Sequence, residues 1–495
     1  MNANALGESS RQHLCLGIML LILSGIFAGV VFPLTVTLAG MQDGDGLMTA
    51  LISTQKLTWY FWGQDRLLNV LPALTHPFTN IETNLRLQVM LRVFFAYLAP
   101  LGVLIFFNRQ PRFLIVATAI ANVVILSCLS AYGLFNIYVQ HNTAGMSLVL
   151  LAAAYALTYS QLPKVLVALL VMLTLCVAYA ANFALLTYAL PMIVLIGALK
   201  TAERKRYGLF LAANLGAILV AKLHSSYFGE ASTSYGLLIS FDGIIESTKT
   251  LYENLHLFLF ATFAAAAGIC YRYAPQKRPW QIAAAVCIGL GLIVLLANTL
   301  WLKMNAYNIR YFITTLVIFT SVIGYLMAQV ILSLNIRYSV IVGLCTVAIA
   351  NCVMWGLGGF NSGYKELVGP AWRDQSAAVA NVAVAQHARV IAGDFWDVWA
   401  AVYQTKREQR SLPKAERIAV YGGTFRAEIL RDQFLDSVRG KGEQNALCFY
   451  SRADQCIQEI AARFHLAPEY TIVLKTSETL QISNRPMLKL VFEVN

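Results

Sequence analysis

Residues 165–199 read VLVALLVMLTLCVAYAANFALLTYALPMIVLIGAL and contain no charged side chain. One helix that crosses a bilayer needs only about 20 residues, so this run is long enough for two short helices. The sequence therefore predicts two spans, 165–180 and 182–199, which are separated around Ala181 and Asn182. A single long tilted helix is the alternative, and it would invert the membrane orientation of every later segment.

Apolar runs of this kind fill most of the chain. Of its 495 residues, 58% are hydrophobic and 13% are charged, whereas soluble domains carry about 25% charged residues. A soluble domain cannot bury so much apolar surface, and a disordered chain would not carry it. We expect an α-helical polytopic membrane bundle of about eleven spans. The expected spans are 13–39, 88–107, 113–132, 146–161, 165–180, 182–199, 208–222, 251–271, 280–302, 311–334 and 339–358.

The charges of the loops predict the orientation of this bundle. With the N-terminus inside, every inner loop is basic, as Arg109, Arg206 and Arg278 illustrate, and most loop carboxylates fall on the outer face. This pattern fits the positive-inside rule. An odd number of spans then places residues 359–495 outside the cytoplasm, so we expect a multi-pass protein of the inner (plasma) membrane. The net charge of +12 is therefore loop charge, and no nucleic-acid-binding motif accompanies it.

The chain is expected to form two domains. Residues 1–358 are the transmembrane module, which includes helices in the first outer loop at 40–87, and residues 359–495 form a soluble extracytoplasmic domain of mixed α/β structure. In this domain we expect strands at 388–392 and 417–421, a helix at 453–465 and a hairpin of 470–482 with 487–494. Cys448 and Cys456 would pair in an oxidising compartment, but their spacing alone leaves the disulfide open.

The first outer loop holds the best candidates for chemistry. Asp43 and Asp45 stand two residues apart in Asp-Gly-Asp-Gly, just after the first span. Such a pair suits a general base with an orienting partner, or it would hold a divalent cation. An ordinary solvated turn is the alternative. Asp65 and Arg66 follow a Trp- and Tyr-rich stretch, where a local ion pair of little energy is the simpler reading.

A late outer loop supplies a second group of candidates. Arg310 and Tyr311 stand at the start of the tenth expected span, where a planar guanidinium would bind a phosphate through two hydrogen bonds. A snorkelling interface anchor is the alternative, and we also expect Arg92 to snorkel. Glu253 and His256 would line a site or cap a helix, and we favour capping.

These features resemble the GT-C membrane glycosyltransferases. In that family a long first outer loop carries an acidic residue soon after the first span, and a late outer loop often carries an Arg-Tyr pair. Asp43 and Asp45 match the acidic position, and Arg310 and Tyr311 match the pair. The usual Asp-Glu is replaced here by Asp-Gly-Asp, so the identity of the acting carboxylate stays open, and Asp65 is a third candidate.

The resemblance implies an inverting sugar transfer on the extracytoplasmic face. The donor would be a sugar on a polyprenyl phosphate, and the acceptor a glycan or a lipid. Asp43 or Asp45 would deprotonate the acceptor hydroxyl, while Arg310, helped by Arg66, would stabilise the departing lipid phosphate. No metal ligand set and no certain cofactor are assigned, although a divalent cation remains compatible with the aspartates.

Three other functions compete with this one. A polysaccharide polymerase or ligase uses similar lipid substrates but relies on arginines in large outer loops. A transporter usually shows internal repeats and charges near the middle of its spans, and this sequence shows neither. A catalytically inactive scaffold with a binding tail is the remaining alternative.

Overall fold

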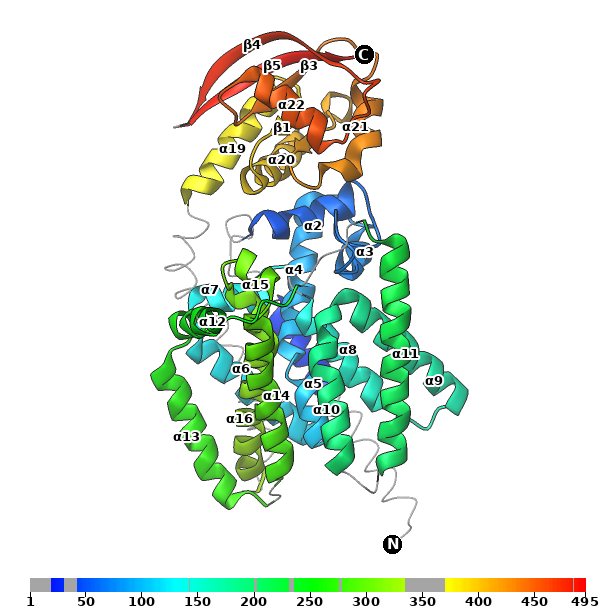
Figure 1. The fold of residues 1–495 in the computed structure, drawn as a ribbon, viewed down its shortest axis with the longest axis vertical. Helices are drawn as coiled ribbons and strands as arrows, with labels where there is room; N and C mark the ends of the chain where they lie inside the picture. The colour runs from blue at the N-terminus through cyan, green and yellow to red at the C-terminus, as the bar shows by residue number, and fades with distance from the viewer. Residues whose placement is uncertain are drawn as a thin grey trace. The chain divides into compact units, whose positions relative to one another are not determined.

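The computed structural model describes residues 19–30, 42–141, 143–199, 203–230, 236–275, 278–333, 370–483 and 485–495. Contacts between residues divide the chain into two compact units, whose elements are labelled in Figure 1. The helical unit comprises Met1–Val36, Asp65–Leu68 and Val89–Tyr364. The C-terminal unit comprises Thr37–Gln64, Asn69–Gln88 and Lys365–Asn495.

The helical unit consists of helices and short connections, because a backbone in an apolar medium must satisfy its hydrogen bonds within each segment. After α4 (Ile81–Leu98), which begins in the C-terminal unit, the helices follow in chain order. They are α5 (Leu101–Phe107), α6 (Pro111–Cys128), α7 (Ala131–Leu134), the π-helix η2 (Phe135–Val139), α8 (Ala144–Leu157), α9 (Lys164–Ala181), η3 (Phe183–Leu185), α10 (Leu186–Leu199), α11 (Arg204–Phe228), α12 (Phe241–Asn254), α13 (Leu257–Tyr273), α14 (Pro279–Ala297), α15 (Leu300–Met304), η5 (Ile309–Phe312) and α16 (Ile313–Ser333).

The apolar helices make the chain a mostly helical polytopic membrane protein. Among the described residues, 6 helices are long and apolar enough to cross a membrane, namely Ile81–Phe107, Pro111–Cys128, Lys164–Ala181, Arg204–Phe228, Pro279–Ala297 and Ile309–Ser333. Shorter apolar helices are Met19–Val30, Ala144–Leu157, Phe183–Leu199 and Leu257–Tyr273. Each expected span in the described part of the chain overlaps one of these helices. The span expected at 339–358 lies outside the described residues, so the total of eleven stays a prediction.

The long apolar run does form two helices. Helix α9 ends at Ala181, and Asn182 leaves the helical region with φ −150° and ψ 94°. The Asn182 side chain then accepts a hydrogen bond from the amide of Ala184 and so caps η3, which leads into α10. An N-cap of this kind starts a new helix rather than continuing the previous one. The predicted separation at Asn182 is confirmed.

The loops predicted to be cytoplasmic lie together at one end of the helical unit. The guanidinium carbons of Arg109 and Arg206 lie 3.8 Å and 3.9 Å from the centroid of the Tyr159 ring. Arg109 also pairs with Glu203 at 3.2 Å, and Arg278 donates to a backbone carbonyl at the end of α5. Four loops predicted to be cytoplasmic therefore share one basic cluster.

Segments at the ends of α6, α12 and α14 also meet, at positions that the sequence placed near the outer ends of their spans. Leu129, after α6, pairs in antiparallel fashion with Leu255, and Leu237 pairs likewise with Thr299. These contacts bring together α7, α12 and α15 (Figure 1). Helix α14 runs from Arg278 in the basic cluster to this second end, so the two sets of loops occupy opposite ends of the bundle.

Arg92 corrects one expectation. Instead of snorkelling, its side chain is buried in the helical unit, with 3% of its surface exposed. Its Nη1 donates to the carbonyl of Val139 at 2.9 Å. Val139 is the last residue of the π-helix η2, where a carbonyl has no partner within its own helix. The arginine therefore satisfies a helix end.

The C-terminal unit contains a five-stranded mixed sheet in the order β2-β1-β3-β5-β4. Strands β2 and β3 pair in parallel with β1, whereas β5 runs antiparallel to β3 and β4. The strands are β1 (Ala388–Ala392), β2 (Tyr421–Gly423), β3 (Gln444–Cys448), β4 (Ile472–Ile482) and β5 (Arg485–Val494), and the helices are α2 (Gly44–Thr54), α3 (Val70–Thr75), α19 (Pro370–Ala385), α20 (Phe395–Glu408), α21 (Arg431–Val438) and α22 (Ala453–Arg463), with the start of α4.

The sequence predicted most of this sheet. Strand β1, the hairpin of β4 and β5, and helix α22 lie where they were expected. The strand expected at 417–421 was misplaced, because regular pairing begins only at Tyr421. Strand β3 was missed, since Gln-Asn-Ala-Leu-Cys contains no β-branched or aromatic residue. A disulfide joins Cys448, at the end of β3, to Cys456 in α22.

The first outer loop groups with the C-terminal residues, whereas the sequence assigned 40–87 to the transmembrane module. Helix α2 packs on α20 and α3, and nearly all of its residues are buried. At the start of α4, the Glu82 carboxylate lies 3.9 Å from Arg407 and 3.3 Å from Arg410. Helix α2 is therefore a packed helix of the C-terminal unit.

Replacement of Lys406 by Met should stabilise the protein. Burial in α20 lowers the pKa of Lys406 to about 8. Below pH 8 the amine is charged in the folded and unfolded states alike, and the folded state alone bears the desolvation cost. We expect Lys406→Met to raise the free energy of unfolding at pH 7 by about 1–2 kcal/mol, measured by thermal unfolding in detergent.

The pH dependence tests the cause. Above pH 8 the folded protein releases this proton before the unfolded chain does, so the wild type gains stability as the pH rises and the advantage of Lys406→Met shrinks. Lys414→Met, at an exposed position, is the control and should change little. An equal advantage at pH 7 and pH 10 would contradict the assignment.

Candidate functional site

Asp43 and Asp45 lie at the start of α2, in the C-terminal unit. The Asp43 carboxylate accepts a hydrogen bond from the amide of Gly46 at 2.8 Å and so caps the helix. A Cβ added at Gly44 would lie 3.1 Å from the Trp396 ring, so the glycine permits this close packing. The Asp-Gly-Asp-Gly motif is therefore the first turn of a packed helix, and the reading as a solvated turn is wrong.

Asp45 pairs with an arginine that the sequence analysis missed. Nη1 of Arg426 lies 3.3 Å from Oδ1 of Asp45, and only 11% and 17% of the two side chains are exposed. The guanidinium carbon also lies 4.8 Å and 5.1 Å from the ring centroids of Phe61 and Phe395. Arg426 belongs to no motif and is 381 positions from Asp45, so no local signal could have identified it.

Asp65 and Arg66, in the helical unit, face different partners. The Asp65 carboxylate lies 3.8 Å from Nζ of Lys222 in α11, and its backbone carbonyl accepts a hydrogen bond from Ser225 of the same helix. The guanidinium carbon of Arg66 lies 4.3 Å from the centroid of the Trp301 ring in α15. The two residues thus attach the chain to different helices.

Arg310 and Tyr311 form one polar group at η5. Nη2 of Arg310 donates to Oδ1 of Asn305 at 3.1 Å and to the hydroxyl of Tyr311 at 2.9 Å. Asn305 in turn donates to the carbonyl of Trp301 at 2.8 Å, the residue on which Arg66 stacks. Protein hydrogen bonds therefore orient the Arg310 guanidinium, and Asn305 and Trp301 link Arg310 to the helix on which Arg66 stacks.

Backbone strain occurs in both units beside candidate residues. In the helical unit Leu67 has φ 63°, and Ala306 and Tyr307 have φ 48° and 52°; in the C-terminal unit Arg426 has φ 77°. Non-glycine residues rarely adopt such angles, which cost of order 1 kcal/mol each. Strained residues cluster at functional sites because the surrounding structure holds them there. The other described non-glycine residues with positive φ are His387, His465 and Ser483, which lie in turns of the C-terminal unit.

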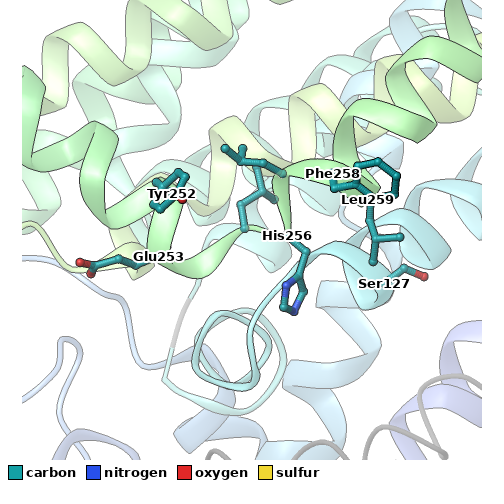
Figure 2. A pocket seen from close by; sticks show the side chains of 8 residues that line it. Ser127, Tyr252, Glu253, His256, Phe258 and Leu259 are labelled. Carbon is teal, nitrogen blue, oxygen red and sulfur yellow. The ribbon is translucent and has the colours of Figure 1, made fainter.

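A separate cavity of about 610 Å³ lies where α12 ends and α13 begins (Figure 2). It is lined by Ser127, Tyr252, Glu253, Leu255, His256, Leu257, Phe258 and Leu259. His256 occupies the N-cap position of α13, but its side chain makes no capping hydrogen bond. Glu253 and His256 thus line a cavity rather than cap a helix, and the residues predicted for catalysis and phosphate binding are not among its lining residues.

The aspartates do not fit a bound divalent cation. In the part of the chain that the structure describes, no three His, Cys, Asp or Glu side chains lie close enough to hold a metal ion. The positive charge of Arg426 also stands 3.3 Å from Asp45, where it opposes a second cation. We therefore derive no metal-dependent step.

Comparison with solved structures finds this fold in the crystal structure of ArnT from Cupriavidus metallidurans bound to undecaprenyl phosphate. The alignment covers 96% of this chain and 97% of that chain, with a TM-score of 0.51 and 10% sequence identity. The chain has the GT-C fold that the resemblance predicted. At this identity the likeness concerns the fold alone. No protein-family model matches the chain, and a sequence search of curated proteins gives no match.

Replacement of Ala306 by Gly should relieve strain in the loop before Arg310. Ala306 has φ 48°, which glycine adopts without steric cost, so we expect Ala306→Gly to raise the free energy of unfolding by about 0.5 kcal/mol. Melting temperatures in detergent measure the change. Ala328→Gly, inside helix α16, is the control and should be destabilised by about 1 kcal/mol or more. Similar losses in both variants would contradict strain at Ala306.

Proposed function

We propose that this chain is a membrane glycosyltransferase that takes a sugar from a polyprenyl phosphate donor. The observation that carries the proposal is the GT-C fold, shared over nearly the whole chain with an ArnT whose crystal structure holds undecaprenyl phosphate. The grouping of Arg66, Arg310 and Tyr311 supports it, because oriented guanidinium groups suit a lipid phosphate. The acceptor is a glycan or a lipid.

The reaction forms one glycosidic bond and breaks one bond to phosphate. Asp45 or Asp43 takes the proton of an acceptor hydroxyl, and the resulting oxygen attacks the anomeric carbon with inversion. The bond between that carbon and the phosphate oxygen breaks, and polyprenyl phosphate leaves with the electron pair. Both carboxylates are held in place, Asp43 by the Gly46 amide and Asp45 by Arg426. Asp65, paired with Lys222, is the third candidate.

The leaving group requires charge stabilisation more than protonation, since it is already an anionic phosphate. Arg310 supplies a positive charge whose orientation is set by Asn305 and Tyr311 before any ligand arrives. Preoriented charges of this kind stabilise developing negative charge without a cost of reorganisation. Arg66, which stacks on Trp301 of the late loop, adds a second cation.

The proposal includes about eleven spans, a cytoplasmic N-terminus and an extracytoplasmic C-terminal domain in the inner membrane. Two observations support this topology. The basic loops gather at one end of the helical unit, away from the end where α12 carries Asp242, Glu246 and Glu253. The disulfide between Cys448 and Cys456 suits an oxidising compartment.

Single substitutions at the proposed site should abolish sugar transfer without loss of protein. One of Asp43, Asp45 and Asp65 is the acting base. We expect its change to Asn to lower the sugar-transfer activity of the protein by about a hundredfold or more. Arg310→Gln should lose about a hundredfold. The readout is mass spectrometry of envelope glycans and lipids from cells that carry each variant or none. Arg431→Gln, an exposed arginine elsewhere, is the control, and full activity in all four site variants would refute the assignment.

Reporter fusions test the topology. Alkaline phosphatase fused after Asn495 should be active and a fluorescent protein there dark, because the former needs an oxidising compartment and the latter fluoresces in the cytoplasm. Fusions truncated after Arg278, in a loop predicted to be cytoplasmic, should give the reverse. A fluorescent reporter at the C-terminus would invert the proposed orientation.

A further inference from the structure

We infer that Arg426 is a positioning residue for Asp45. Through this arginine, the C-terminal residues of the chain hold the Asp45 carboxylate of the first outer loop in place. The inference rests on the proposed function, in which Asp45 is a candidate base. It adds a residue that the GT-C resemblance did not supply. The evidence consists of the contacts of Arg426, its backbone conformation and the space left for it.

The contacts place the Arg426 guanidinium among groups from both parts of the C-terminal unit. From the first loop come the Asp45 carboxylate at 3.3 Å and the Phe61 ring at 4.8 Å. From the C-terminal residues come the rings of Phe395 at 5.1 Å and Phe425 at 5.4 Å. An arginine on aromatic faces keeps favourable contacts when it leaves water, better than a lysine would. The guanidinium is therefore held against Asp45 from several directions.

The backbone of Arg426 is strained in order to reach this place. Its φ of 77° and ψ of 11° are left-handed, a conformation that costs a non-glycine residue about 1 kcal/mol. A glycine would avoid the cost, but it would leave Asp45 without the guanidinium. The chain thus bears this cost at a position where the arginine side chain contacts Asp45.

The first loop leaves space for the arginine. Gly63 has φ 67°, and a Cβ added there would lie 2.9 Å from Cγ of Arg426. Any larger residue would push the arginine away from Asp45. The first loop and the C-terminal residues therefore pack closely at Gly63 and Arg426, and the ion pair of Arg426 with Asp45 joins the same two parts.

The pair has a direct consequence for catalysis. A base must keep its oxygen within hydrogen-bond reach of the proton that it removes, and a displacement of about 1 Å can cost a hundredfold in rate. Nη1 of Arg426 and the helix turn that begins at Asp43 together restrict the Asp45 side chain. Removal of the guanidinium would leave a partly buried carboxylate free to turn away.

Arg426→Met and Arg426→Lys form the matched pair of variants, because both keep an unbranched chain of similar volume and only lysine keeps the charge. In cells, we expect Arg426→Met to lower glycan modification by about tenfold to a hundredfold, and Arg426→Lys to retain clearly more activity. A role in packing alone predicts equal activity for the two. Equal activity in both variants, or wild-type activity in Arg426→Met, would overturn the inference.

A third variant separates function from folding. Arg426→Gly removes the guanidinium and also the backbone strain, so its melting temperature in detergent should stay near that of the wild type while its activity falls as in Arg426→Met. Wild-type activity in a stable Arg426→Gly protein would overturn the inference even if Arg426→Met failed to fold. Arg431→Gln is again the control, with unchanged stability and activity.

Two further variants distinguish this inference from the proposed function. If Asp45→Asn is inactive while Arg426→Met is fully active, only the positioning role fails. If Asp45→Asn is active and Arg310→Gln is inactive, the role of Asp45 fails, and the positioning role fails with it, while lipid phosphate binding stands. If Asp43→Asn, Asp45→Asn, Asp65→Asn and Arg310→Gln are all fully active, the proposed function itself fails.

Discussion

A charge that leaves water requires a partner, and this requirement decides how the polar segments of the chain fold. A buried carboxylate without a compensating charge is strongly destabilising, and so is a buried guanidinium without hydrogen bonds. In the C-terminal unit the constraint appears as the pair of Asp45 with Arg426. In the helical unit it appears as Arg92 on the carbonyl of Val139 and as Arg310 on Asn305 and Tyr311.

The partners come from distant parts of the sequence, so each pair fixes a loop as well as a charge. Asp45 begins the first helix of the first outer loop, and its arginine follows the short strand β2. Arg66 is likewise placed by Trp301 of a late loop. Loops without such pairs would be free to move on the surface. Here the charged side chains proposed for catalysis also organise the segments that carry them.

The fold persists at 10% identity with ArnT because the bilayer imposes few demands on sequence. A spanning helix needs apolar side chains and a complete set of backbone hydrogen bonds, and many sequences satisfy both. Chemistry is more demanding, since it needs particular groups at particular positions. The positive φ angles at Ala306, Tyr307 and Arg426 mark places where the chain departs from its preferred local geometry beside the side chains proposed for catalysis.

Hydropathy and periodicity are local properties of the sequence, so the helices and strands that depend on them could be predicted from it. They predicted the apolar helices, the separation at Asn182, strand β1 and the hairpin of β4 and β5. They also drew attention to Arg310, which stands at the start of an apolar run, whereas the role of Arg66 came from the resemblance.

Other features depended on contacts between residues far apart, and only the tertiary structure decided them. Strand β3 has weak intrinsic β propensity and forms because it is paired on both sides, with β1 and β5. Helix α2 packs on α20 although most of the helical unit lies between them in the sequence. The sequence could not single out Arg426, because an arginine next to a phenylalanine is no functional motif. Only the fold shows that Arg426 pairs with Asp45.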